Sequence, residues 1–117
     1  YSFYIPDNRH NAHDTSIGFA DRWYSSAFGA LLENSNFMRN TVLITTFDEG
    51  SFHNTKNQIY TSIVGENVNA GIVTEKLNLY SLLKLMEENW RLGTLGREDA
   101  NAAKIPNIWN RKWYDIK

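Results

Sequence analysis

The chain has 117 residues, of which 42% are hydrophobic, 21% are charged and none is cysteine, and its formal net charge at pH 7 is -1. This composition fits a small folded domain or a piece of a larger one and excludes a disordered chain. The charge gives no basic footprint for nucleic acid, no apolar run approaches the roughly 20 residues of a membrane span, and thiolate metal sites are excluded.

The first third of the chain is expected to form a short strand, a polar loop and a helix. Residues 1–5 are mostly apolar and stop at Pro6, which suits a strand that ends there. Residues 7–14 are polar and are expected to form a loop. Apolar side chains then recur at helical spacing from residue 17 to residue 31. The candidate N-caps of this helix are Asp14, Thr15 and Ser16.

Two strands are expected in the middle of the chain. Residues 41–47 are β-branched or apolar at nearly every position, a pattern that suits a strand buried on both faces of a parallel sheet. Residues 59–64 form the second expected strand, which Gly65 closes. The polar residues 49–57 connect the two strands.

A second amphipathic helix is expected over residues 79–90. Asn78 is its expected N-cap, and Gly93 is its expected C′ residue. Beyond residue 96 the chain is polar but carries several large apolar side chains, which predict an extended tail that packs its rings against another segment. These side chains include Ile105, Ile108, Trp109, Trp113 and Tyr114.

The order of these elements favours an α/β layered fold. Two strands are too few to complete such a sheet. The chain also begins at Tyr1 with neither a methionine nor a signal-like segment. We therefore expect it to be part of a longer protein and to pack on the rest of its own domain or on another chain.

The most informative residues are Asp48 and Glu49, which end the first expected strand just before Gly50. In α/β proteins, reactive groups lie just outside the carboxyl ends of strands. Two carboxylates there can hold a hard cation or transfer a proton. The alternative is a solvated turn in which Asp48 caps the following backbone.

Three histidines are the other candidates. His10 and His13 have a spacing that could bind zinc on a helix, but the expected loop weakens this interpretation. His13 precedes Asp14, whose carboxylate can orient the imidazole and raise its pKa. His53 could join the acids around one ion or phosphate, or lie free on the surface. The sequence contains no serine elbow, cysteine nucleophile or glycine-rich phosphate loop.

Four segments resemble those of one protein family in their order and spacing. They are His13-Asp14-Thr15-Ser16 before a Trp-bearing helix, residues 36–41 running into residues 46–49, residues 57–60 leading to Val64-Gly65, and residues 80–83 followed by residues 88–99. The chain resembles, over nearly all of residues 1–100, the phosphoesterase family that contains fungal acid phosphatases and bacterial phospholipase C enzymes. That family belongs to the alkaline-phosphatase-like superfamily.

The resemblance implies the C-terminal portion of a three-layer α/β/α fold with a mostly parallel sheet. It implies hydrolysis of a phosphorylated small molecule at a divalent metal ion of unknown identity, through a hydroxyl nucleophile that lies upstream of this region. By position, Asp48 and Glu49 correspond to the family's late metal-binding pair. His13 and Asp14 correspond to its His-Asp motif at the phosphate site. A secreted or cell-surface location is implied as well.

Three departures from the family pattern leave a second hypothesis open. Leu79 stands where many relatives have a histidine two residues before the serine of the Tyr-Ser segment. Gln58 stands where bacterial relatives often have a histidine, and Asn11 stands where aspartate is usual. These changes favour a degenerate relative that binds a phosphorylated or protein ligand without turnover. A third hypothesis is a structural module that uses its Trp/Tyr-rich tail as the contact surface.

Overall fold

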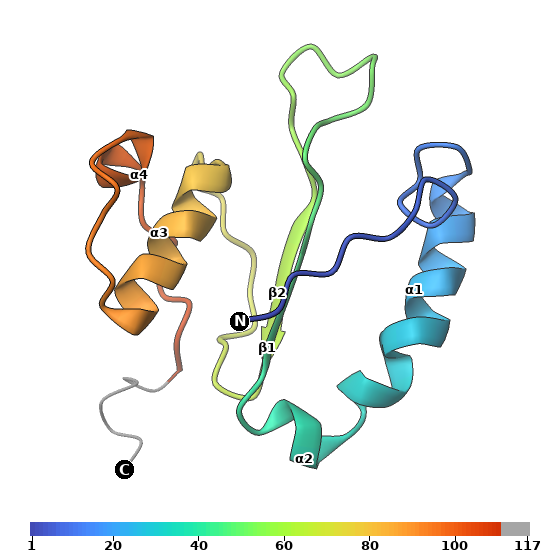
Figure 1. Cartoon of the computed structure of the whole chain (residues 1–117), viewed down its shortest axis with the longest axis horizontal. Coiled ribbons are helices and arrows are strands. Elements are labelled where there is room, and N and C mark those ends of the chain that lie inside the picture. The colour runs from blue at the N-terminus through green and yellow to red at the C-terminus, as the bar shows by residue number, and fades with distance from the viewer. Residues whose placement is uncertain (111–117) are drawn as a thin grey trace. The chain divides into compact units, whose positions relative to one another are not determined.

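The computed structural model describes residues 1–110 and divides into two units, Tyr1–Glu66 and the residues from Asn67 onward (Figure 1). Its elements are α1 (Ile17–Leu32), α2 (Ser35–Met38), β1 (Val42–Thr46), β2 (Thr61–Gly65), α3 (Leu79–Trp90) and α4 (Glu98–Asn101). The first unit contains α1, α2 and both strands, and the second contains α3 and α4. The fold is mixed α/β. Trp113 and Tyr114, predicted as part of a packing tail, lie outside the described residues.

Helix α1 confirms the helix predicted from the apolar spacing. Its N-cap is Ser16, whose hydroxyl accepts a hydrogen bond from the N–H of Phe19 at 3.3 Å. This bond satisfies one of the backbone donors left free at a helix start. The short helix α2, which the sequence did not predict, starts at Asn34, whose side chain accepts from two following backbone N–H groups.

Strands β1 and β2 pair antiparallel, from Val42 opposite Gly65 to Thr46 opposite Thr61. The sequence favoured a parallel sheet for the first strand. The segment between these strands contains no helix, and a parallel return needs a crossover, usually helical, so the two strands pair as an antiparallel ribbon. The middle residues of β1 are half-buried and its ends are exposed, so the expected burial on both faces is absent in the described residues.

Residues 1–5 are not a strand, contrary to the prediction, because they make no ladder in the described part of the chain. The Tyr4 ring instead packs on α1, 6.1 Å from the Trp23 ring and edge-on to Phe28 at 5.7 Å. Helix α1 is tied to β1 by a 2.6 Å hydrogen bond between the hydroxyls of Tyr24 and Thr45. The first unit is therefore held by aromatic contacts and one polar link between helix and strand.

Helix α3 of the second unit confirms the predicted range and the predicted N-cap. The Asn78 side chain and the Ser81 side chain bond reciprocally to each other's backbone N–H, which forms a capping box. At the other end Arg91 takes the left-handed conformation with φ 54°, and the Leu92 N–H bonds to the Glu87 carbonyl at 2.9 Å. Arg91 therefore closes the helix in a Schellman motif, two residues before Gly93, the predicted C′ residue, which also has a positive φ of 80°.

Two longer-range contacts complete the second unit. Lys84 on α3 donates to the carbonyls of Ala100 and Ala102, both at 2.9 Å, and so caps the end of α4. Val68 forms an antiparallel bridge with Trp109, and Asn69 donates to the Trp109 carbonyl at 3.1 Å. The backbone of the segment after α4 therefore pairs with the start of the second unit, and the predicted packing of the tail's rings stays a prediction.

Asp99 is the best-buried large side chain among residues 1–110, with 1% of its surface exposed. Its carboxylate accepts hydrogen bonds from the Thr94 hydroxyl, from the Leu95 N–H at 2.8 Å and from the Arg97 N–H at 3.0 Å. The Thr94 bond is the largest of the causes that lower the pKa of Asp99. The ionised Asp99 carboxylate thus holds the turn between α3 and α4 through these hydrogen bonds.

Glu87 on α3 lies beside the Asp99 carboxylate, and only 6% of its surface is exposed. Burial raises the pKa of Glu87, and the negative charge of Asp99 and a hydrogen bond to it raise that pKa further. A protonated Glu87 can share its proton with Asp99, whereas two ionised carboxylates would repel each other.

We predict that the thermal stability of the protein is greatest at mildly acid pH. The stability due to Glu87 is fully present below the ordinary glutamate pKa and is lost as pH rises through the raised pKa. That due to Asp99 is present above the ordinary aspartate pKa and is lost as pH falls through the lowered pKa. In melting curves measured across pH, Glu87→Gln should reduce the fall in melting temperature on the alkaline side of the maximum and leave the fall on the acid side unchanged. An unchanged decline in Glu87→Gln would contradict the assignment.

Large apolar side chains remain exposed along much of the described chain. Only Met38, Leu82 and Leu85 are buried hydrophobic residues in residues 1–110. Exposed examples include Phe3, Ile5, Phe52, Ile72, Leu92 and Leu95, all above 70%. Within residues 1–110, no helix is long and apolar enough to cross a membrane.

Candidate active site

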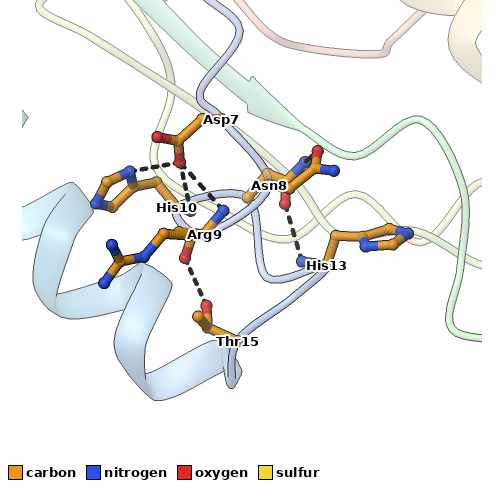
Figure 2. A network of polar contacts seen from close by, with 7 residues as sticks. Asp7, Asn8, Arg9, His10, His13 and Thr15 are labelled. Atoms are coloured by element: carbon orange, nitrogen blue, oxygen red, sulfur yellow. Dashed lines mark hydrogen bonds and ion pairs between the residues drawn. The ribbon is translucent and has the colours of Figure 1, made fainter.

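The loop of residues 7–15 presents the first predicted site residue, His13. The loop is held by side-chain contacts to its own backbone, as Figure 2 shows. Asp7 accepts hydrogen bonds from the N–H groups of Arg9 and His10, and the Asn11 side chain accepts from the His13 N–H at 2.9 Å. Short polar side chains bonded to nearby backbone are what stabilise such turns. The loop predicted from composition is therefore confirmed, and it has a defined shape.

His13 and Asp14 form the predicted imidazole–carboxylate pair. The Nδ1 atom of His13 lies 2.7 Å from Oδ1 of Asp14, and both side chains are more than half exposed. This bond and the charge of Asp14 raise the pKa of His13, and the negative charges of Glu49 and Asp48 raise it further. The two predicted acids are therefore near enough to His13 to favour its protonated form.

Asp48 and Glu49 follow β1 after Phe47, at the predicted strand end, and both are exposed. The Asp48 carboxylate accepts the Glu49 N–H at 3.0 Å. This is the turn contact expected under the alternative interpretation, and it leaves the remaining carboxylate oxygens of both residues open to a ligand. The two interpretations of this pair are therefore compatible.

The loop after these acids is clamped at its neck. The Gly50 N–H donates to the Asn57 side chain at 2.7 Å, and the Asn54 side chain donates to the Gln58 carbonyl at 2.8 Å. A Cβ atom on Gly50 would lie 3.0 Å from that same carbonyl oxygen, so a larger residue would push the neck apart. The clamp fixes the backbone that follows Glu49.

A divalent metal ion is the group that the predicted site would hold. Carboxylate oxygens are the ligands preferred by hard cations, so the chemistry of Asp48 and Glu49 fits. Within residues 1–110, however, no three His, Asp, Glu or Cys side chains converge on one point. A metal ion bound by Asp48 and Glu49 would therefore need further ligands from outside the described residues.

The other two histidines do not join His13. His10 is bonded to Asp7 and packs on aromatic rings of α1, which argues against the zinc interpretation of the His10/His13 spacing. The His53 ring lies edge-on to Phe52 with ring centroids 5.9 Å apart. Within residues 1–110, no hydrogen bond or ion pair links His53 to Asp48 or Glu49.

Two features of the structure were not predicted from the sequence. Asp7 and Asn11 shape the loop that carries His13; the Pro6-Asp7 turn signal could have indicated the first of them. The buried pair of Glu87 and Asp99 could not be predicted, because nothing in the local sequence distinguishes a buried acid from an exposed one.

Several curated phosphatases are similar to this chain. A probable acid phosphatase of Kluyveromyces lactis is 33% identical over 126 residues, covering 92% of this chain and 29% of that protein. An acid phosphatase of Aspergillus niger is 34% identical over 106 residues, covering 87% and 25%. A phosphatidylinositol-3-phosphatase of Mycobacterium tuberculosis is 32% identical over 108 residues, covering 92% and 35%. The chain thus spans about a third or less of the length of these relatives.

No solved structure matches the chain significantly. The family comparison is decisive, because the model of the Phosphoesterase family matches residues 1–93, most of the chain. That match includes the His13-Asp14 pair, both acids after β1 and helix α3. The resemblance inferred from four short segments is therefore confirmed, and the chain belongs to the phosphoesterase family.

Proposed function

We propose that the protein hydrolyses phosphate esters, as acid phosphatases do, at a divalent-metal site to which Asp48 and Glu49 contribute ligands. The observation that carries this proposal is the 2.7 Å contact between His13 Nδ1 and Asp14 Oδ1, in a loop whose histidine has its pKa raised by Asp14 first and by the charges of Glu49 and Asp48 in addition. Family membership and the identity to acid phosphatases support it.

The residues of this chain have complementary tasks in that reaction. A phosphoryl group in transfer concentrates negative charge on its oxygens, and a bound metal would offset that charge. His13, kept protonated by its carboxylate neighbours, would donate a hydrogen bond to a phosphate oxygen or protonate the leaving group. Asp14 would hold the imidazole in the tautomer and orientation that this donation needs. The hydroxyl nucleophile and the other metal ligands would come from outside residues 1–110.

The same proposal includes the fold around the site. We propose that the two units form part of a three-layer α/β/α domain with a mostly parallel sheet. The many exposed apolar side chains support packing on further parts of that domain. The similarity to fungal acid phosphatases supports a secreted or cell-surface location.

A binding function without turnover is the second candidate. Leu79 is the first residue of α3 and is 42% exposed, at the position where many relatives carry a histidine. A leucine can neither ligate a metal nor transfer a proton, so this change removes one functional group from the family pattern. Under this candidate the protein binds phosphate analogues and does not release product.

The test of the proposed function is an assay of the complete natural protein on an aryl phosphate from pH 4 to pH 8, with and without chelator. Turnover that chelation abolishes and divalent metal restores is expected. Orthovanadate binding in the absence of any turnover would instead support the non-catalytic candidate. The activity should fall as pH rises through the raised pKa of His13, because the protonated imidazole is then lost.

We predict that Asp14→Asn shifts the alkaline limb of this pH profile to lower pH. Asp14 is the main cause of the raised pKa of His13, and a neutral amide removes its charge while keeping its shape. His13→Gln should lose about a hundredfold in kcat and should also lose that limb. An alkaline limb that stays in place in Asp14→Asn would show that another group titrates there. Asp21→Asn, the same change at an exposed site on α1, is the control.

A further inference from the structure

We infer that His10, together with Asp7, is a positioning residue that fixes the loop carrying His13 against helix α1. The inference rests on the proposed function, since His13 must have a task for its position to matter. Neither residue touches the reacting group in this assignment. Both act through the backbone of residues 7–15.

The first link lies within the loop. One carboxylate oxygen of Asp7 accepts from the N–H of Arg9 at 3.1 Å, from the N–H of His10 at 3.2 Å and from the His10 ring Nδ1 at 2.7 Å (Figure 2). The Asp7 carbonyl also accepts the N–H groups of His10 and Asn11. Asp7 therefore sets both the turn and the direction of the His10 ring.

The second link joins the loop to the helix. The His10 ring lies 4.9 Å from the Trp23 ring and is stacked at 5.8 Å from the Phe19 ring, both on α1. Its side chain is 29% exposed, so most of the imidazole is covered. Aromatic contacts of this kind add to the free energy gained from burying apolar area. His10 is thus the side chain of the loop that packs on α1.

The third link closes the loop around His13. The Asp14 N–H donates to the Asn8 carbonyl at 2.9 Å, and the Thr15 hydroxyl donates to the Arg9 carbonyl at 2.5 Å. Between them Ala12 has φ 67°, a left-handed conformation that is unfavourable for alanine. A strained residue persists only where its surroundings over-determine it, so this network holds the backbone just before His13 in place.

His13 itself makes no such packing contact. Its side chain is 70% exposed and is hydrogen-bonded to Asp14, which moves with the same loop. The position of the imidazole relative to Asp48 and Glu49 therefore depends on the loop and its attachment to α1. Small displacements of a group that transfers a proton lower turnover strongly.

The experiment separates the two attachments of His10 in the complete natural protein. His10→Ala removes both the hydrogen bond to Asp7 and the ring contacts with α1. His10→Phe keeps an aromatic ring against Trp23 and Phe19 but loses the hydrogen bond. His10→Asn keeps a donor for Asp7 but loses the ring. We expect His10→Ala to lose about tenfold in kcat with KM changed less than about twofold, and the other two variants to recover part of that loss. Amide hydrogen exchange should quicken at His13 and Asp14 in His10→Ala and stay unchanged in α1.

Asp7→Ala should reproduce the loss of kcat. Its matched control is Asn34→Ala, which also removes a side-chain acceptor of two backbone N–H groups but lies at the start of α2; that variant should keep wild-type kcat. Wild-type kcat and exchange in His10→Ala would overturn the inference. So would a loss of kcat accompanied by faster exchange throughout residues 1–66, since that is loss of fold. A wild-type protein without turnover overturns the proposed function instead, and exchange at His13 and Asp14 then decides alone whether His10 fixes the loop.

Discussion

Asp48→Asn is expected to lower metal-dependent hydrolysis of an aryl phosphate by about a hundredfold to a thousandfold. The substitution replaces a charged oxygen ligand with a neutral amide and so lowers the affinity for a divalent cation. The melting temperature should change little, because Asp48 is exposed and its carboxylate is hydrogen-bonded to the N–H of the next residue. Steady-state kinetics, metal content of the purified protein and a thermal melt measure these three quantities.

The control for this substitution is Asp21→Asn. It makes the same chemical change at an exposed position on α1, far along the chain from both acids. Metal content and rate should equal those of the wild type. A wild-type rate in Asp48→Asn would remove Asp48 from the site, whereas loss of rate with full metal content would assign it a role other than ligation.

Asp99→Ala is expected to cause the largest loss of stability among substitutions of polar residues described here. The change removes the buried carboxylate that the Thr94 hydroxyl and the N–H groups of Leu95 and Arg97 share as their acceptor. Three hydrogen bonds to a charged group are lost together, and a cavity is left where the buried side chain stood. We expect a fall in the melting temperature on the order of 5 °C or more, measured at mildly acid pH.

Glu98→Ala provides the comparison, because this neighbouring acid is exposed on the same short helix. Its effect should be small. Asp99→Asn should fall between the two, since an amide oxygen can still accept from part of the donor set. Equal melting temperatures for Asp99→Ala and Glu98→Ala would mean that the turn is held by other contacts, such as those of Lys84 to the end of α4.

The elements that the sequence predicted correctly are those set by local signals. Helix α1 follows from the spacing of its apolar residues, and the cap at Asn78 follows from residue type. The errors concern partners that are distant in sequence. Whether β1 pairs parallel or antiparallel depends on how the chain returns, and residues 1–5 are not a strand because Tyr4 packs on the rings of α1.

The candidate site shows the same division. Residue order alone was sufficient to single out Asp48, Glu49 and the His13-Asp14 pair, because strand ends and imidazole–carboxylate neighbours are visible in a sequence. The task of His10 was not visible, since its two aromatic contacts come from α1 and exist only after folding. Periodicity can show which face of a helix is apolar, but it does not reveal which loop covers that face.

The clamp below the tip of the β1–β2 connection has an evolutionary consequence. The Asn57 and Asn54 side chains close the neck at Gly50 and Gln58, while Phe52 beyond it is fully exposed. Residues of the tip can therefore be inserted, deleted or substituted during evolution while the backbone beside Glu49 keeps its conformation.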